Sequence, residues 1–215
     1  IPVSLASIFP AGTVDSPRIL CYLETGKTPV SIINPRHFYT IRKELEQRMN
    51  IALQFAMPAE LHALPGARDL LVVETVAGIP FFQAAPGVLA CAGGVSKVNA
   101  AMTAQILCLH FGVDLILNAG VAGCLTDLPT GSLVVASEFV QHDVDTTAVG
   151  DPIGLVSTVN RVDFPTWQPE YCAALLQELG YPASIGRVAT GDWFAVRGER
   201  AAWLRDTFSP LLVEM

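Results

Sequence analysis

Single carboxylates that follow apolar, strand-like runs are the residues best suited to chemistry. Glu60 comes a few positions after the run IALQFA, where a carboxylate can orient or deprotonate a water molecule. The structural alternative for Glu60 is an acidic residue in the first turn of a helix. His142, Asp143 and Asp145 form an H-D-x-D pattern. No second cluster at ligand spacing accompanies that pattern, so we expect no metal site.

Glycine-rich and aromatic segments stand at other expected strand ends. AGGVSK (92–97) lacks the G-x-G-x-x-G spacing and no segment matches G-x-x-x-x-G-K-[ST], which argues against nicotinamide and nucleoside-triphosphate chemistry. Taken alone, either glycine turn favours plain strand-to-helix geometry over a ligand loop, and NAGVAG (118–123), whose residues are too small for core packing, is the more suggestive of a ligand. Phe194 can stack on a planar base or pack in the core, and Asp192 is expected to cap or tie its loop. No Ser/His/Asp set or Cys/His pair stands out at strand ends, so we expect no covalent catalysis.

Alternating strands and helices from Asn50 onward must position these groups. This alternation predicts an α/β domain with a mostly parallel sheet, in which ligands bind at the carboxyl ends of strands. A hairpin is expected to turn at Ala77-Gly78. The expected strands are residues 51–56, 70–85 (the hairpin), 88–94, 114–120, 131–141, 184–192 and 211–215, and the expected helices are residues 96–112, 169–180 and 199–208.

Residues 1–49 differ from the rest of the chain. The first 18 residues are rich in Pro, Ser and Gly and predict irregular chain. TPVSIIN (28–34) predicts a strand, and Asn34 and Pro35 begin a short amphipathic helix. The segment carries no recognisable chemistry. We interpret it as an N-terminal extension of unknown role that precedes a domain at residues 50–215.

Composition limits the classes of partner. The chain has 215 residues, 51% hydrophobic and 15% charged, which suits one core built around a sheet covered on both faces. A net charge of -7 argues against nucleic acid and membrane surfaces and favours a neutral or cationic small molecule. No apolar run approaches the roughly 18 residues that span a bilayer. Five cysteines without a CxxC pair predict reduced thiols and a cytoplasmic location.

The order of the motifs is more specific than any one of them. AMPAE, GGVSKVNAA, NAGVAGCL, VQHDVDTTAVG, ATGDWF and VEM follow one another from about Asn50 to Met215, and this series resembles the 5'-methylthioadenosine/S-adenosylhomocysteine nucleosidases. VQHDVD followed by DPIGL resembles the members that also hydrolyse 6-amino-6-deoxyfutalosine in menaquinone synthesis. The resemblance implies a nucleoside-phosphorylase-like α/β fold, with a mixed sheet flanked by helices on both faces. It also implies a homodimer, no metal, no cofactor, and release of adenine, as in methionine salvage.

The resemblance also assigns roles to individual residues. Glu60 falls on the carboxylate that activates water, Phe194 on the aromatic that stacks against adenine, and Ala195 on the residue whose backbone binds the base. Val121, Ala122 and Gly123 match the turn beside ribose and base, and Met57, Val95 and Met215 match positions that line the sugar and its 5' substituent. Glu214 is also expected among the substrate-binding residues. Two further positions that the neighbouring subunit lends to the 5' pocket are Thr146 and Val149.

The resemblance assigns no residue of this chain to the family's general acid, which protonates the leaving adenine. In the family the motif continues V-E-M-E, with the second Glu on the ribose hydroxyls, and a later Ser-Asp supplies the acid. Asp192 matches a loop aspartate instead. We therefore expect the 215-residue chain to be inactive as a nucleosidase and a longer parent chain to be active, which a turnover assay with methylthioadenosine on both would test.

Two alternatives remain open. A purine nucleoside phosphorylase has the same fold and uses phosphate, but it needs cationic residues at the site, and AMPAELHAL offers a Glu and no Arg. A non-catalytic adenosine-binding protein belongs to another class. Adenine analogues that raise its melting temperature without base release would favour it.

Overall fold

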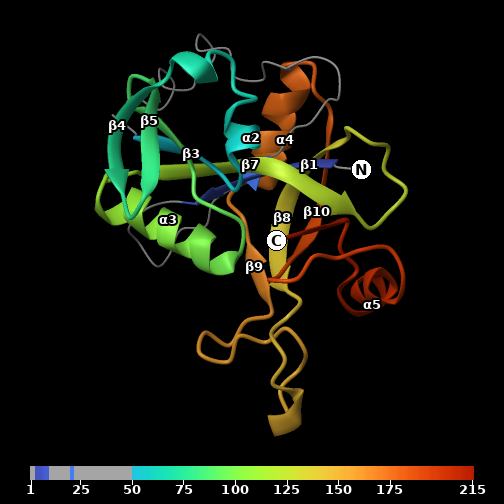
Figure 1. Ribbon diagram of the computed structural model, residues 1–215. Coiled ribbons are helices and arrows are strands. Elements are labelled where there is room, and N and C mark those ends of the chain that lie inside the picture. The colour runs from blue at the N-terminus through green and yellow to red at the C-terminus, as the bar shows by residue number, and fades with distance from the viewer. Residues whose placement is uncertain (1–2, 10–19, 22–49) are drawn as a thin grey trace.

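A computed structural model describes residues 3–9, 20–21 and 50–215 (Figure 1). The strand expected at residues 28–34 and the helix expected after it lie outside the described residues. The helices and strands are β1 (Val3–Phe9), β2 (Leu20–Cys21), β3 (Ile51–Phe55), α2 (Pro58–Leu61), η1 (Ala67–Asp69), β4 (Leu71–Val76), β5 (Ile79–Ala85), β6 (Val88–Ala92), α3 (Lys97–Leu109), β7 (Leu115–Cys124), β8 (Leu133–Gln141), η2 (Thr147–Val149), β9 (Asp163–Pro165), α4 (Pro169–Glu178), β10 (Ala183–Thr190), α5 (Glu199–Phe208) and β11 (Leu212–Glu214).

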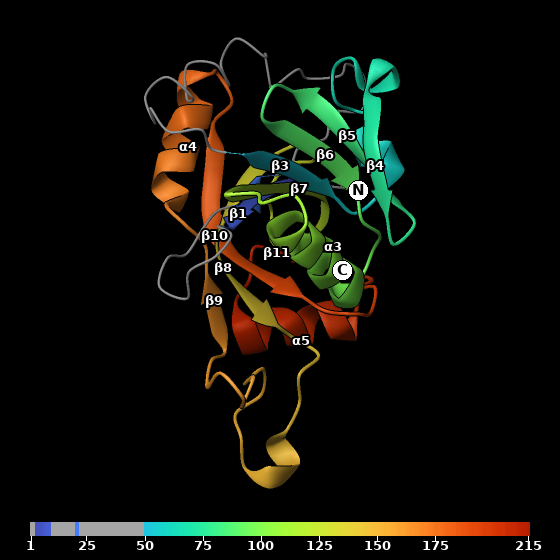
Figure 2. The same ribbon diagram turned by 90° about the vertical axis from the view of Figure 1, so that its left-hand side faces the viewer.

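Strand β3 shows why both faces of the sheet are covered. Every residue of β3 is buried, and successive side chains of a strand point to opposite faces. Leu53 packs in a cluster with residues of α4, whereas Ala52 packs in another cluster with Leu107 of α3. Helices α4 and α3 therefore lie on opposite sides of the sheet, as Figure 2 shows. The expectation of helices on both faces is confirmed.

The sheet is mixed, as the resemblance implied, whereas the expectation of a mostly parallel sheet from the alternating pattern is wrong. Its strand order is β1-β2-β8-β10-β11-β7-β3-β6-β5-β4, with β9 paired to β8. β3 runs parallel to β6 and β7, and β10 runs parallel to β8 and β11. The two groups meet where β11 runs antiparallel to β7, with Val213 opposite Gly123. The end of β11 therefore runs back along β7, toward the point where β3 ends.

The N-terminal strand β1 was not expected. Its seven residues pair antiparallel with residues 116–122 of β7, and it also pairs with β2 and β8. Backbone groups along this edge of β7 need hydrogen-bond partners, and β1 supplies them. The prediction of irregular chain is therefore wrong for Val3–Phe9. The pattern of Pro, Ser and Gly gave no sign of this partner because β7 lies over a hundred positions away in the sequence.

The local turn signals are mostly confirmed. The hairpin of β4 and β5 turns at Ala77 and Gly78, whose φ angles of 51° and 80° suit a tight turn of the type that favours glycine. α4 begins at Pro169, and Gly180 follows its end with a φ of 87°.

Cys91 is a buried thiol, and burial raises its pKa to about 12. Within the described part of the chain, no helix has the length and apolar character needed to cross a membrane.

Candidate active site

Glu60 is fixed by backbone amides from the segment that follows β3 and from β7. It lies in the short helix α2, directly after β3. Its Oε2 accepts hydrogen bonds from the N–H groups of Ala56 (3.1 Å) and Met57 (2.9 Å), and its Oε1 accepts one from Val121 of β7 (2.9 Å). Both interpretations of Glu60 therefore hold in part. The carboxylate caps its own helix, and it also joins the end of β3 to β7, which a simple first-turn residue would not do.

The segment NAGVAG is strand and not the ligand turn that its small residues suggested. β7 continues through Cys124, so Val121, Ala122 and Gly123 lie within it. A Cβ on Gly123 would lie 3.2 Å from Cγ1 of Val213, so glycine allows β11 to pack closely here. The small residues thus serve close strand packing, and they leave Val121 with a backbone N–H directed at Glu60.

The end of β11 brings Glu214 to the same region. Glu214 is partly buried and lies opposite Thr190 of β10. Burial raises the pKa of Glu214 above its ordinary value of 4.5, a hydrogen bond with Thr190 opposes this, and the negative charges of Glu60 and Asp192 raise the pKa further. The three carboxylates named here are therefore close enough to interact. The structure thus places Glu214 among the predicted site residues.

We expect Glu214→Gln to stabilise the protein at neutral pH. The folded protein binds the Glu214 proton more tightly than the unfolded chain, so wild-type stability falls as pH rises above 4.5. Glutamine keeps an oxygen for Thr190 and carries no charge. Thermal melts at several pH values should show a higher melting temperature for the variant at pH 8, with the gap shrinking toward pH 4.5. A gap that does not change with pH would contradict this account.

The 191–195 loop carries the predicted base-binding residues. Phe194 is 76% exposed, so the core interpretation of this aromatic is wrong and its face is available to a planar ligand. Trp193 is the ring that packs inward, against His142 (ring centroids 4.3 Å apart). Ala195 is partly buried against the cluster that contains residues of α5. Asp192 ties the loop, as expected, because its Oδ1 accepts the N–H of Lys97 (2.8 Å).

The H-D-x-D segment serves structural hydrogen bonds. Asp143 faces the ammonium group of Lys97 (2.6 Å), and Asp145 accepts the N–H and hydroxyl of Thr147. Across residues 50–215 and the short N-terminal strands, no three His, Cys, Asp or Glu side chains gather as metal ligands would. The H-D-x-D pattern indicated these aspartates only as metal ligands. It gave no sign of Lys97, which stands 46 positions away at the start of a helix.

The remaining predicted residues divide into two groups. Met57, Val95 and Met215 are partly exposed at the ends of their segments. The N–H of Met57 itself binds Glu60, and Val95 lies two residues before Lys97, which binds Asp192. Thr146 and Val149 lie instead on the segment between β8 and β9, which projects away from the sheet (Figure 1). Val149 is 80% exposed. The structure does not bring these two residues to the others within one chain.

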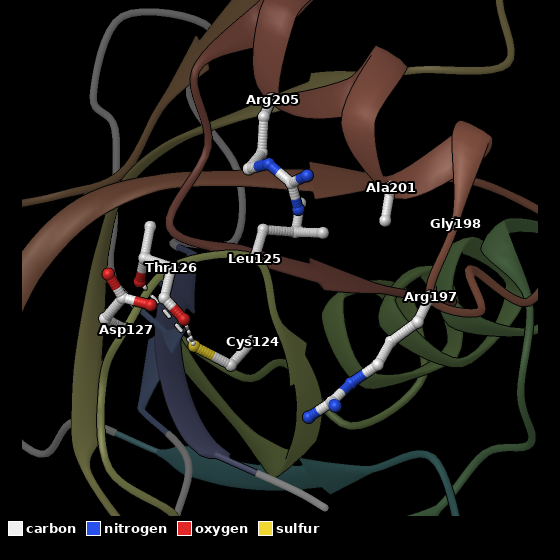
Figure 3. Close-up of a pocket in the computed structure, with 8 residues that line it drawn as sticks. All are labelled: Cys124, Leu125, Thr126, Asp127, Arg197, Gly198, Ala201 and Arg205. Carbon is white, nitrogen blue, oxygen red and sulfur yellow. Dashed lines mark hydrogen bonds between the residues drawn. The ribbon is translucent and has the colours of Figure 1, made fainter.

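A cavity of about 720 Å³ adjoins the predicted site. It begins at Cys124, directly after Gly123, and continues to Arg197, two residues after Ala195. Figure 3 shows Arg197 and Arg205 extending toward the segment of Cys124 and Thr126 from α5 and the loop before it. The Sγ of Cys124 is 3.1 Å from the backbone oxygen of Thr126. Two guanidinium groups therefore face a hollow at the edge of the site. The cavity lining is Cys124, Leu125, Thr126, Asp127, Arg197, Gly198, Ala201 and Arg205.

Comparison with known proteins agrees with this arrangement. Residues 50–215 match the profile of the phosphorylase superfamily, which places the chain in that class. It is 35% identical to the 5'-methylthioadenosine/S-adenosylhomocysteine nucleosidase of Geobacillus kaustophilus, over 78% of this chain and 74% of that protein. It is 32% identical to the enzyme of the same name from Treponema pallidum, over 65% of this chain and 62% of that protein. The chain belongs to this nucleosidase family.

A solved structure supports the same fold. The futalosine hydrolase of Helicobacter pylori superposes with a TM-score of 0.70 at 28% identity, covering 78% of this chain and 77% of the other. The nucleoside-phosphorylase-like fold is therefore confirmed. The matched segment is about three fifths of the Treponema protein's length.

Proposed function

We propose that the protein hydrolyses the N-glycosidic bond of 5'-substituted adenine nucleosides and releases adenine. The substrates are 5'-methylthioadenosine, S-adenosylhomocysteine and 6-amino-6-deoxyfutalosine, which gives the protein a place in methionine salvage and the menaquinone route. The observation that carries the proposal is Glu60, a carboxylate held by three backbone N–H groups between β3 and β7. The relatives named nucleosidase and futalosine hydrolase support the substrate class.

Different residues act on the adenine and on the ribose of the substrate. Phe194, whose ring is exposed, stacks against adenine. Glu60 directs a water molecule at the anomeric carbon and stabilises the positive charge that develops on the ribose. The leaving base must also be protonated. Glu60 is assigned to the water and Phe194 to the base, so neither of them supplies that proton.

Adenine release measures the proposed function directly. Protein expressed from its complete reading frame is expected to release adenine from 5'-methylthioadenosine in phosphate-free buffer, followed by chromatography. Adenine is also expected from 6-amino-6-deoxyfutalosine. Ligand-induced thermal stabilisation without any release would instead support a non-catalytic adenosine-binding protein.

The proposal includes a cytoplasmic homodimer. Thr146 and Val149 do not join the site of their own chain, and the large exposure of Val149 suits a position in a neighbouring subunit's 5' pocket. Thr146 is itself held in place, since its hydroxyl donates to Asp151 (2.8 Å). In this arrangement each site receives the two residues from the other copy of the chain.

A purine nucleoside phosphorylase is the second candidate. The specific observation in its favour is the cavity beside Gly123, which Arg197 and Arg205 line (Figure 3). Guanidinium groups bind phosphate well. Both arginines are solvent-exposed, and Asp127 in the same lining opposes an anion, so hydrolysis remains the better supported reaction.

A further inference from the structure

The 191–195 loop has no regular secondary structure of its own, so other segments must hold it in place. Its first residue, Gly191, lies against the ring of His142, and Trp193 packs on the same ring. Asp192, the second residue of the loop, makes two polar contacts with other segments. The N–H of Asp192 donates to Oδ2 of Asp143 (2.8 Å), and Oδ1 of Asp192 accepts the N–H of Lys97 (2.8 Å).

Lys97 connects both of these contacts. Its backbone N–H binds Asp192, while its ammonium group binds Oδ1 of Asp143 (2.6 Å) and Oε1 of Gln141 (3.0 Å). Lys97 and Asp143 are mostly buried, so solvent and salt screen their interaction less than that of a surface pair. Burial raises the pKa of Asp143, but hydrogen bonds from Lys97 and from the Asp192 N–H outweigh it and hold the pKa below 3.8.

The start of α3 shows that this arrangement replaces an ordinary helix cap. Ser96 occupies the N-cap position with a φ of 92° and makes no side-chain cap hydrogen bond. The Asp192 carboxylate, 95 positions away in the sequence, binds the first helical N–H instead. A negative charge at this end also interacts favourably with the helix dipole. The helix start that follows Val95 and the loop that carries Phe194 therefore share one set of bonds.

We propose that Lys97 and Asp143 are positioning residues that set the 191–195 loop for base binding. This inference rests on the proposed function, because it gives Phe194 and Ala195 their role toward adenine. Neither Lys97 nor Asp143 needs to touch the base. The ion pair fixes Asp143, Asp143 fixes the N–H of Asp192, and the loop two residues later presents the ring of Phe194.

Hydrogen exchange and adenine binding test the proposal together. Lys97→Met removes the ammonium group and keeps the backbone N–H, and Asp143→Ala removes the acceptor of the Asp192 N–H. Both variants are expected to speed exchange in a peptide that spans residues 190–196 about tenfold and to weaken adenine binding, measured by calorimetry, about tenfold. Lys97→Arg retains the charge and is expected to recover most of both losses.

Two controls separate positioning from general destabilisation. Glu74→Gln changes the exposed carboxylate that contacts His110 and is expected to leave exchange and adenine affinity unchanged. Gly78→Ala strains the β4–β5 turn, where φ is 80°, and is expected to lower the melting temperature without weakening adenine binding. A melting temperature for each variant shows that it is folded.

Each outcome decides one claim. Wild-type exchange rates in Lys97→Met and Asp143→Ala would overturn the positioning role, whatever the protein's activity. Faster exchange with unchanged adenine affinity would overturn it as well, because the pair would then stabilise the loop without affecting base binding. A wild-type protein that fails to bind adenine would overturn the proposed function, and the role of the pair toward the base with it.

Discussion

Glu60→Gln is expected to lower the rate of adenine release from 5'-methylthioadenosine about a thousandfold, within the range typical of losing a general base. The substitution removes the negative charge that activates water and stabilises the ribose in the transition state. The effect should appear in kcat, because Glu60 acts on water and not on the adenine ring. The rate is measured as adenine release at saturating substrate, with protein from the complete reading frame.

The structure also predicts what Glu60→Gln leaves intact. Glutamine offers one oxygen to the N–H groups of Ala56 and Met57 or to that of Val121, and its amide NH2 then faces the remaining N–H, so we expect a cost in stability of about 1–3 kcal/mol. Adenine affinity should change little. Glu74→Gln, at an exposed carboxylate paired with His110, is the matched control and should keep full activity. If Glu60→Gln retained more than about a tenth of wild-type activity, Glu60 would not be the general base.

Gly191→Ala is expected to displace the base-binding loop. A Cβ at this position would overlap the buried imidazole of His142, lying 2.5 Å from Nε2 and 2.7 Å from Nδ1. The ring has no free space, since His142 is 1% exposed and Trp193 packs against it. Overpacking of this kind costs about 1–3 kcal/mol. Phe194 and Ala195 follow within four residues, so adenine affinity should fall at least about tenfold.

A second substitution distinguishes this clash from other causes. His142→Ala removes the ring that Gly191→Ala would meet, so the double variant should bind adenine more tightly than Gly191→Ala alone. Calorimetric titration with adenine measures both. No recovery in the double variant would show that the loop fails for a different reason. Gly78→Ala, which strains a turn without a steric neighbour within 4 Å, should lower stability and leave adenine affinity unchanged.

The local patterns predicted much of the fold. The Ala77-Gly78 turn, Pro169 at the start of α4 and Gly180 after its end are signals that act within a few residues, and the structure has them as expected. The apolar run at residues 211–215 was expected to be a buried strand, and Leu212 and Val213 of β11 are buried. Backbone conformation at these points depends on the residues themselves, which is why the sequence alone indicates them.

Long-range pairing accounts for the errors. Residues 118–123 were expected to turn because they are small, yet β1 and β11 pair with parts of β7 and hold it extended. The antiparallel approach of β11 also makes the sheet mixed. No local pattern specifies which strands will be neighbours, because pairing depends on the whole chain.

In the candidate site, too, positions after strands were predicted from the sequence, whereas partners far along the chain were not. Glu60 and Asp192 were singled out from their positions after strands, and each makes backbone hydrogen bonds that join separate segments. Lys97 was missed as the partner of Asp143 because 46 positions separate them. Phe194 could not be assigned to core or surface from its sequence position. In the structure the neighbouring Trp193 packs on His142, and Phe194 is exposed.

The identity of the sugar product tests the central claim most directly. In buffer that contains phosphate, protein from the complete reading frame is mixed with 5'-methylthioadenosine, and the products are identified by mass spectrometry. Hydrolysis by water that Glu60 activates predicts free 5-methylthioribose and adenine in equal amounts, with the same yield when phosphate is left out. Formation of 5-methylthioribose 1-phosphate would contradict the account and would assign the cavity of Arg197 and Arg205 to phosphate.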